Sequence, residues 1–157
     1  MIEVHENLFV GNESDCADRL NGFAVVHACK HPCHARAVGY QGNLASTHPH
    51  YLFYSKDNNL YLNMIDPPKP LFKIELFHKY MEFVNMKWDD GKNILIHCNQ
   101  GESRAPSLAL LFLAKSLRAI SNASYAEARQ DFTTFYPAYY PGKGIQIFLE
   151  QNWDSIV

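Results

Sequence analysis

The chain has 157 residues, 47% of them hydrophobic, and a formal net charge of −2 at pH 7 with the histidines neutral. This length and apolar content predict one globular domain, residues 1–157, and exclude a disordered chain. A net charge near zero provides no general basic field for nucleic acid or an anionic membrane, so any anion site has to be local. The start, MIEVHENLFVGN, lacks the features of a signal peptide, and the four cysteines do not indicate a disulfide framework. We therefore expect a cytoplasmic monomer with no nucleic-acid or membrane partner.

Short apolar segments dominate the first half of the chain, and strands alternate with helical patterns in the second half. In chain order, 7–12 and 23–28 predict strands, 30–50 is irregular, and 51–54 with 60–65 predict an antiparallel pair around KDNN. A helix over 71–88 is followed by a central strand over 93–98, after the turn-like DDGK. Further helices are predicted over 105–118, after a Ser124–Glu127 capping box, and over 144–153. The pattern predicts an α/β domain with a central mixed, largely parallel sheet flanked by helices.

The segment HCNQGESRAPS joins the predicted central strand to a buried helix. Cys98 stands six positions before Arg104, with Gly101 between them. Backbone N–H groups of such a loop and of the helix N-terminus form a cradle for an anion, and a guanidinium can bind two phosphate oxygens. The same groups stabilise a cysteine as its thiolate. The segment therefore predicts a phosphate-binding loop between strand and helix, in which Cys98 attacks a bound phosphoryl group.

HCNQGESR resembles the HC-x2-G-x2-R signature of the cysteine-based protein tyrosine phosphatases, and the short chain resembles their dual-specificity branch. NLFVGN is similar to the opening strand of these domains, and PGKGI to the Pro-Asn-x-Gly-Phe stretch before their last helix. The resemblance implies a phosphomonoester hydrolase that acts on phosphorylated proteins or peptides through a cysteinyl phosphate, with no metal or organic cofactor. It implies Cys98 as nucleophile, Arg104 as phosphate clamp and His97 as the residue that orients Cys98. The implied phosphate-binding loop comprises Asn99, Gln100, Gly101, Glu102 and Ser103.

The resemblance also requires a general acid on a loop upstream of the cysteine. Asp66 lies 32 residues before Cys98, after LYLNMI and before PPKP. Its implied role is to protonate the leaving oxygen and then to deprotonate the attacking water, which contributes about 10²–10⁴-fold in rate. An ordinary Asp-Pro turn is the alternative interpretation. Asp89 and Asp90 belong to the DDGK turn, about 20–25 Å from Cys98 at the far end of the strand, and are predicted to be turn residues.

Two positions depart from the family pattern. Position 105 usually carries Ser or Thr, whose hydroxyl donates to the thiolate when the phosphoenzyme breaks down. Ala105 cannot donate, so we expect slower turnover rather than inactivity, with Ser103 or Ser107 as candidate substitutes. Glu102 would repel a dianion if it pointed at the phosphate. We expect it to turn outward, where it disfavours acidic substrates such as phosphoinositides.

The segment HACKHPCHARA concentrates histidines and cysteines. Cys29 and Cys33 form a C-x3-C pair, but no second ligand pair follows at the spacing of a zinc finger. His27 closes an apolar strand and is expected to pack in the core. We therefore expect no metal site. By analogy with the same family, we place this basic segment at the rim of the active site, where His34 or Arg36 meets a phosphopeptide.

Two alternative functions stay open. The first is a non-catalytic pseudophosphatase that binds phosphoproteins, which Ala105 and Glu102 favour and the intact Cys98, Arg104 and Asp66 oppose. The second is a phosphatase of a small phosphorylated metabolite. The string FTTFYPAYYPG is expected to be a packed edge of the core rather than a nucleic-acid stacking surface, because few basic residues accompany it.

Overall fold

The computed structural model describes residues 1–157 and places all its strands in one sheet. The strands are β1 (Ile2–His5), β2 (Leu8–Gly11), β3 (Phe23–His27), β4 (Phe53–Lys56), β5 (Asn59–Leu62) and β6 (Asn93–His97). They lie in the order β1-β2-β6-β3-β5-β4. The four inner strands are parallel, and β1 and β4 pair antiparallel at the two edges. The predicted α/β fold with a mixed, largely parallel sheet is confirmed.

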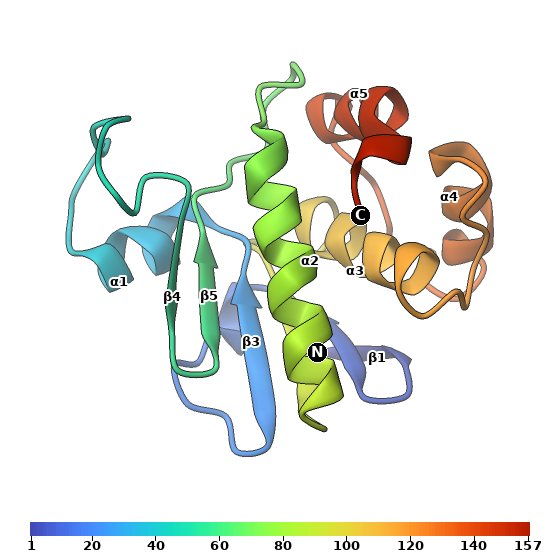
Figure 1. Cartoon of the computed structure of the whole chain (residues 1–157), viewed down its shortest axis with the longest axis horizontal. Coiled ribbons are helices and arrows are strands. Elements are labelled where there is room, and N and C mark those ends of the chain that lie inside the picture. The colour runs from blue at the N-terminus through green and yellow to red at the C-terminus, as the bar shows by residue number, and fades with distance from the viewer.

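The helices are α1 (Ala35–Val38), α2 (Ile74–Asp89), α3 (Arg104–Lys115), α4 (Tyr125–Thr133) and α5 (Lys143–Asn152). Three shorter turns of helix complete the chain: η1 (Glu13–Asp15), η2 (Lys30–His34) and η3 (Trp153–Ser155). Figure 1 shows α2 running in front of the sheet, with α3, α4 and α5 grouped to one side of it and α1 near β4 on the other. None of the helices is both long and apolar enough to cross a lipid bilayer.

Side chains alternate between the two faces of the central strand β6. Ile94 and Ile96 belong to the main hydrophobic core with residues of α2 and α3. Leu95 and His97 therefore point to the opposite face, and η2 contacts β5, which lies beyond β3 in the sheet. The carboxyl ends of the parallel strands β6, β3 and β5 lie at one edge of the sheet, and the predicted site residues follow two of these ends.

The boundaries differ from the sequence prediction where polar or exposed residues form the element. Strand β1 was not predicted, because its residues are partly or fully exposed and show no apolar run. The first strand of the hairpin was predicted two residues too early, and the second was predicted to begin one residue too late. Strand β4 carries the exposed Ser55 and Lys56, and the turn is Asp57–Asn58 with Asp57 at φ +56°.

Two of the predicted helices are shorter at one end in the structure. Helix α2 begins at Ile74 rather than 71, because Lys73 is extended, although Phe72 still packs against the core. Helix α3 ends at Lys115, before Arg118 turns left-handed at φ +54°. The predicted N-cap of α4 is confirmed, since the N–H of Glu127 donates to the Oγ of Ser124 at 3.1 Å.

Candidate active site

Cys98 follows β6 directly and begins the loop that leads to α3. Its side chain continues the alternation of Ile94 and Ile96 onto the helix-covered face, and it is only 2% exposed. The N–H of Gly101 donates to the Sγ of Cys98 at 3.2 Å, and the N–H of Cys98 donates to the carbonyl of Gly11 at 3.4 Å. A sulfur that accepts a backbone N–H is stabilised as the thiolate, the form that attacks phosphorus.

The conformation of Gly101 directs this N–H at the sulfur. Gly101 has φ +76°, which disfavours any residue with a side chain, and a Cβ there would lie 3.1 Å from the carbonyl oxygen of Gly11. Its own carbonyl accepts a hydrogen bond of 2.6 Å from the buried hydroxyl of Tyr136. Strand β2 and an aromatic side chain therefore fix the turn from two sides.

Arg104 is half-buried at the start of α3, and its guanidinium is held in place by main-chain carbonyls. Nη1 donates to the carbonyls of Ala28 at 3.2 Å and Met64 at 3.0 Å, and Nη2 donates to the Oδ1 of Asn99 at 2.9 Å. Two N–H donors remain, one on Nη2 and one on Nε, and Nε is buried without a hydrogen-bond partner. A buried donor without a partner is costly, and an oxygen of a bound phosphate is an acceptor that fits a guanidinium.

Asp66 lies on the loop after β5 and is linked to the phosphate-binding loop by Ser103. The Ser103 hydroxyl donates to the Oδ1 of Asp66 at 3.1 Å and accepts from the N–H of Gly142 at 2.8 Å. A Cβ on Gly142 would collide with the Asp66 carboxylate, so a glycine is needed there. Three segments far apart in the sequence therefore meet at one carboxylate.

One pocket of about 370 Å³ contains these groups. It is lined by Asp66, Cys98, Asn99, Gln100, Glu102, Ser103, Arg104, Tyr140 and Gly142. The structure thus brings the three predicted catalytic residues to one cavity. His97 does not line it: its side chain is buried on the opposite face of the sheet, and its Nδ1 lies 3.4 Å from the carbonyl of Cys98.

Solved structures similar in fold to this chain include phosphatases and a phosphatase-like protein. The human tyrosine phosphatase-like serine/threonine/tyrosine-interacting protein aligns over 98% of this chain and 95% of its own, with a TM-score of 0.66 and 19% identity. Human DUSP28 aligns over 99% and 96%, with a TM-score of 0.68 and 16% identity. The PTP-2 phosphatase of Cydia pomonella aligns over 96% and 88%, with a TM-score of 0.64 and 19% identity. The chain has the dual-specificity phosphatase fold. A scan against models of protein families finds no match.

Within this dual-specificity phosphatase fold, no hydroxyl compensates for Ala105. Ala105 is fully buried. Ser103 is occupied by Asp66 and Gly142, and the hydroxyl of Ser107 pairs with that of Tyr139 at 2.7 Å. The only hydrogen bond to the Cys98 sulfur comes from a backbone N–H. Both substitutes considered from the sequence are therefore engaged elsewhere.

Replacing Gly101 by alanine tests whether the turn at this residue matters for catalysis as well as for stability. Gly101→Ala is expected to destabilise the protein by about 1–2 kcal/mol and to lower hydrolysis of p-nitrophenyl phosphate, because the added Cβ displaces the N–H that faces Cys98. Gly42→Ala is the matched control, since Gly42 has φ +68° with nothing within 4 Å of the added Cβ. Urea unfolding gives both stabilities, and steady-state assays give both rates. Equal rates in the two variants would contradict a role for the Gly101 turn in catalysis.

The rim of the pocket differs from the sequence prediction. His34 cannot meet a phosphopeptide, because it is fully buried and bonded to the Tyr40 hydroxyl and the His50 carbonyl. Arg36 contacts Asp18 and Cys16 instead of the pocket. These two contacts were wrong, although the segment does lie beside the loop: the Nδ2 of Asn99 donates to the carbonyl of His31 at 3.0 Å. The aromatic string packs at an edge of the core as predicted, with Phe132, Tyr136 and Tyr139 buried, but Tyr140 is 77% exposed and lines the pocket.

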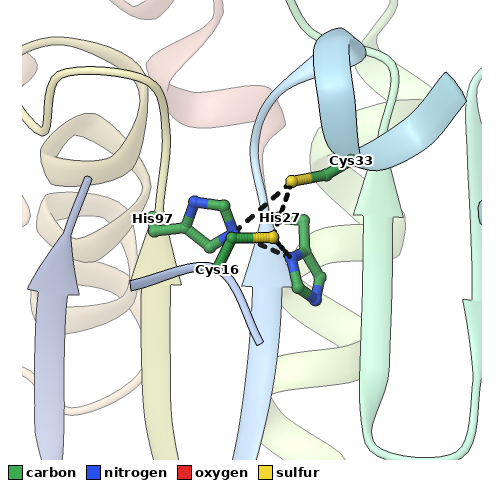
Figure 2. A group of neighbouring side chains, drawn as sticks. All are labelled: Cys16, His27, Cys33 and His97. Atoms are coloured by element: carbon green, nitrogen blue, oxygen red, sulfur yellow. Dashed lines mark hydrogen bonds between the residues drawn. The ribbon is translucent and has the colours of Figure 1, made fainter. Parts of the chain in front are cut away.

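The spacing of residues after Cys33 predicts no second pair of metal ligands, but the fold brings Cys16 from before this segment and His97 from β6 next to His27 and Cys33. Figure 2 shows the side chains of Cys16, His27, Cys33 and His97 pointing toward one another. Their potential ligand atoms all lie within 4.8 Å. Only the pairing of β3 with β6 brings His27 and His97 together, and this pairing cannot be seen in a local spacing.

The two cysteines of this group are electrostatically unequal. The Sγ atoms of Cys16 and Cys33 lie 2.9 Å apart, and the hydrogen bond from Cys33 lowers the pKa of the Cys16 thiol to about 2, helped by His27 and His97. The same pairing raises the pKa of Cys33 well above its ordinary value. Of the two thiols, Cys16 is therefore the one that loses its proton more readily.

Proposed function

We propose that the whole chain, residues 1–157, is the catalytic domain of a dual-specificity-type phosphatase that hydrolyses phosphomonoesters through a cysteinyl phosphate. The observation that supports this most is the arrangement at Cys98. A backbone N–H is directed at its sulfur, and the buried, unpartnered Nε of Arg104 belongs to a side chain that lines the same pocket. Asp66 lines that pocket as well. These are the parts needed for a nucleophile, a clamp for the anion and an acid.

The proposed reaction has two displacements at phosphorus. The Cys98 thiolate attacks the phosphoryl group, the P–O bond to the leaving group breaks, and Asp66 gives its proton to the departing oxygen. A water then attacks the phosphocysteine while Asp66 takes up a proton from it, and the S–P bond breaks to return the thiolate and free phosphate. Arg104 and the N–H groups of the loop stabilise the charge on the phosphoryl oxygens in both transition states.

We propose phosphorylated proteins or peptides in the cytoplasm as substrates, bound by a monomer. The pocket carries an exposed carboxylate, Glu102, and an exposed aromatic ring, Tyr140, at residues that line it. Arg104 is the only basic residue lining the pocket. A pocket lined by a single positively charged side chain disfavours substrates with several phosphates. The exposed tyrosine ring can stack on a side chain of a bound peptide.

Stopped-flow hydrolysis of p-nitrophenyl phosphate tests the proposal. We expect a burst of nitrophenol equal to the enzyme concentration, followed by slow turnover, and no burst in Cys98→Ser. Release no faster than in Cys98→Ser at any pH between 5 and 8 would contradict the enzymatic function. Binding of a phosphotyrosine peptide by such an inactive protein would then support the second candidate, a phosphoprotein-binding module. Ala105 favours this candidate, because the group that assists the second displacement is missing.

Restoring the missing hydroxyl is expected to accelerate turnover. Ala105→Ser adds a donor that can hydrogen-bond the departing Cys98 thiolate, and a bond to a charged group contributes about 1.5–3 kcal/mol, which corresponds to roughly ten-fold or more in kcat. Ala109→Ser, one turn further along α3 and equally buried, is the control for placing a serine in this helix. Steady-state kcat and the ratio of burst to turnover rate provide the measurement. An unchanged kcat in Ala105→Ser would show that dephosphorylation is not the slow step.

A further inference from the structure

A side-chain cluster outside the phosphate pocket combines two cysteines and two histidines. His27 and His97 are directly paired across β3 and β6, so their side chains lie next to each other on one face of the sheet. Cys16 reaches them from the turn after η1, and Cys33 from η2 (Figure 2). His27, Cys33 and His97 are fully buried, and Cys16 is partly exposed. The fold therefore brings four metal-ligating side chains from four segments to one point.

The hydrogen bonds around the two imidazoles engage one nitrogen of each ring and leave the other nitrogen facing the cluster. Asn59 donates through Nδ2 to the carbonyl of Asp18 at 2.8 Å, so its Oδ1 accepts from the Nε2–H of His27 at 2.9 Å. The Nδ1 of His97 faces the carbonyl of Cys98, which can only accept. The Nδ1 of His27 and the Nε2 of His97 face each other 2.7 Å apart. These are the two nitrogens that a metal ion in the cluster would bind.

We propose that Cys16, His27, Cys33 and His97 bind a structural zinc ion through Sγ, Nδ1, Sγ and Nε2. A tetrahedral site with Zn–S of about 2.3 Å and Zn–N of about 2.0–2.1 Å places its ligand atoms roughly 3.3–3.8 Å apart. The distances from Cys16 to His27 and from Cys33 to His97 are 3.6 and 3.9 Å. The S–S and N–N distances, 2.9 and 2.7 Å, are shorter, and binding requires each pair to open by less than about 1 Å.

The chemistry of the donors favours zinc over a hard cation. Two thiolates and two neutral imidazoles form a Cys₂His₂ set, and the two negative charges neutralise the ion in a buried place. Binding releases the protons that the sulfurs carry. Asn59 fixes the tautomer of His27, and the ring of Tyr61 stacks on it with 4.4 Å between centroids. The partly exposed Cys16 gives the ion a route from solvent.

The position of the cluster indicates what the ion stabilises. It joins the turn after β2, the ends of β3 and β6, and η2, which otherwise have only a few packed apolar residues between them. His97 immediately precedes the nucleophile, so a fixed imidazole also fixes the start of the phosphate-binding loop. The proposed role of the ion is structural. Zinc content and unfolding temperature measure this role without any assay of catalysis. A negative result for the metal site would therefore leave the proposed function unaffected.

Cobalt substitution and metal analysis test the site in the reduced full-length chain. On a Cys98→Ser background, which removes the pocket thiol as a competing ligand, we expect one tightly held zinc per chain. We also expect a Co²⁺ spectrum with the intense visible bands and thiolate charge-transfer band of a tetrahedral S₂N₂ site. Cys16→Ser and Cys33→Ser are expected to lose this spectrum, and Asn59→Ala to weaken zinc binding about 10–100-fold. Cys29→Ser, which removes a buried cysteine of the same segment outside the group, is expected to retain it.

Removal of the metal gives a second, independent measurement. A chelator is expected to lower the Tm of the wild type and of Cys29→Ser by about 5 °C or more, and to leave that of Cys16→Ser unchanged. Circular dichroism establishes that each variant is folded. The site is overturned if reduced wild type with free thiols gives no thiolate–cobalt band, or if Cys16→Ser binds zinc as tightly as Cys29→Ser. A Cys16–Cys33 disulfide in protein purified from a reducing cytosol would overturn it as well.

Discussion

Asp66→Asn is expected to lower kcat/KM for phenyl phosphate by about 10²–10⁴-fold, because kcat/KM reports the step in which the leaving oxygen departs and asparagine cannot give that oxygen a proton. Asparagine retains an Oδ1 that accepts from Ser103, so the link between the two loops survives and the change isolates the proton. The loss should be smaller for p-nitrophenyl phosphate, whose leaving group departs readily without protonation. The measurement is kcat/KM for both esters in both proteins, because kcat is expected to be limited by breakdown of the phosphoenzyme, which is the same for both esters.

The dependence on the leaving group distinguishes an acid from a structural residue. A general structural defect would lower both rates by the same factor. Asp89→Asn is the matched control, because Asp89 is an exposed aspartate at the end of α2, remote from the pocket. Equal losses for the two esters, or a loss in Asp89→Asn as large as in Asp66→Asn, would contradict the assignment of Asp66 as the acid.

Arg104→Lys is expected to lower kcat/KM by about 10²–10³-fold or more, the effect of removing a preorganised donor from a developing oxyanion. The guanidinium reaches the carbonyls of Ala28 and Met64 with one nitrogen and Asn99 with another, while Nε remains for the anion. A lysine ammonium has no planar fork and cannot make these contacts together. The positive charge is preserved, so the variant tests geometry rather than net charge.

Vanadate and phosphate inhibition extends this test to the ground state. If Arg104 clamps the phosphoryl group, Arg104→Lys should also weaken inhibition by both anions, since both occupy the position of the transferred group. Arg19→Lys, an exposed arginine outside the pocket, serves as control. A variant Arg104→Lys that retains full kcat/KM would contradict the clamp, whatever its stability.

The fold could be predicted from the sequence wherever burial imposed a pattern. The strands NLFVG, FAVVH and NILIH are buried on both faces and therefore stand out as apolar runs. The exposed strand β1 and the polar hairpin of β4 show no such run, and their pairing partners determine their positions. The same holds for the start of α2, where Phe72 packs into the core from an extended segment that helical spacing cannot distinguish.

The candidate site could be predicted where the chemistry was local. The residues from His97 to Arg104 form one continuous segment, so their spacing can be read directly from the sequence. Asp66 was identified from the number of residues that separate it from Cys98. A segment far along the chain contributes Tyr136, Tyr140 and Gly142 to the site. No pattern in the sequence relates their positions to that of Cys98. The group around His97 is an extreme case, because strand register alone makes His27 its neighbour.

Rapid-quench trapping of the phosphoenzyme tests the central claim most directly. Wild type is mixed with excess phosphorylated substrate and quenched in acid within the burst phase, and the peptide that contains Cys98 is analysed by mass spectrometry. The proposed chemistry predicts one phosphoryl group on Cys98 in wild type, more of it than in Ala105→Ser, and none in Cys98→Ser. An unmodified Cys98 peptide during a measurable burst would contradict covalent catalysis at this residue.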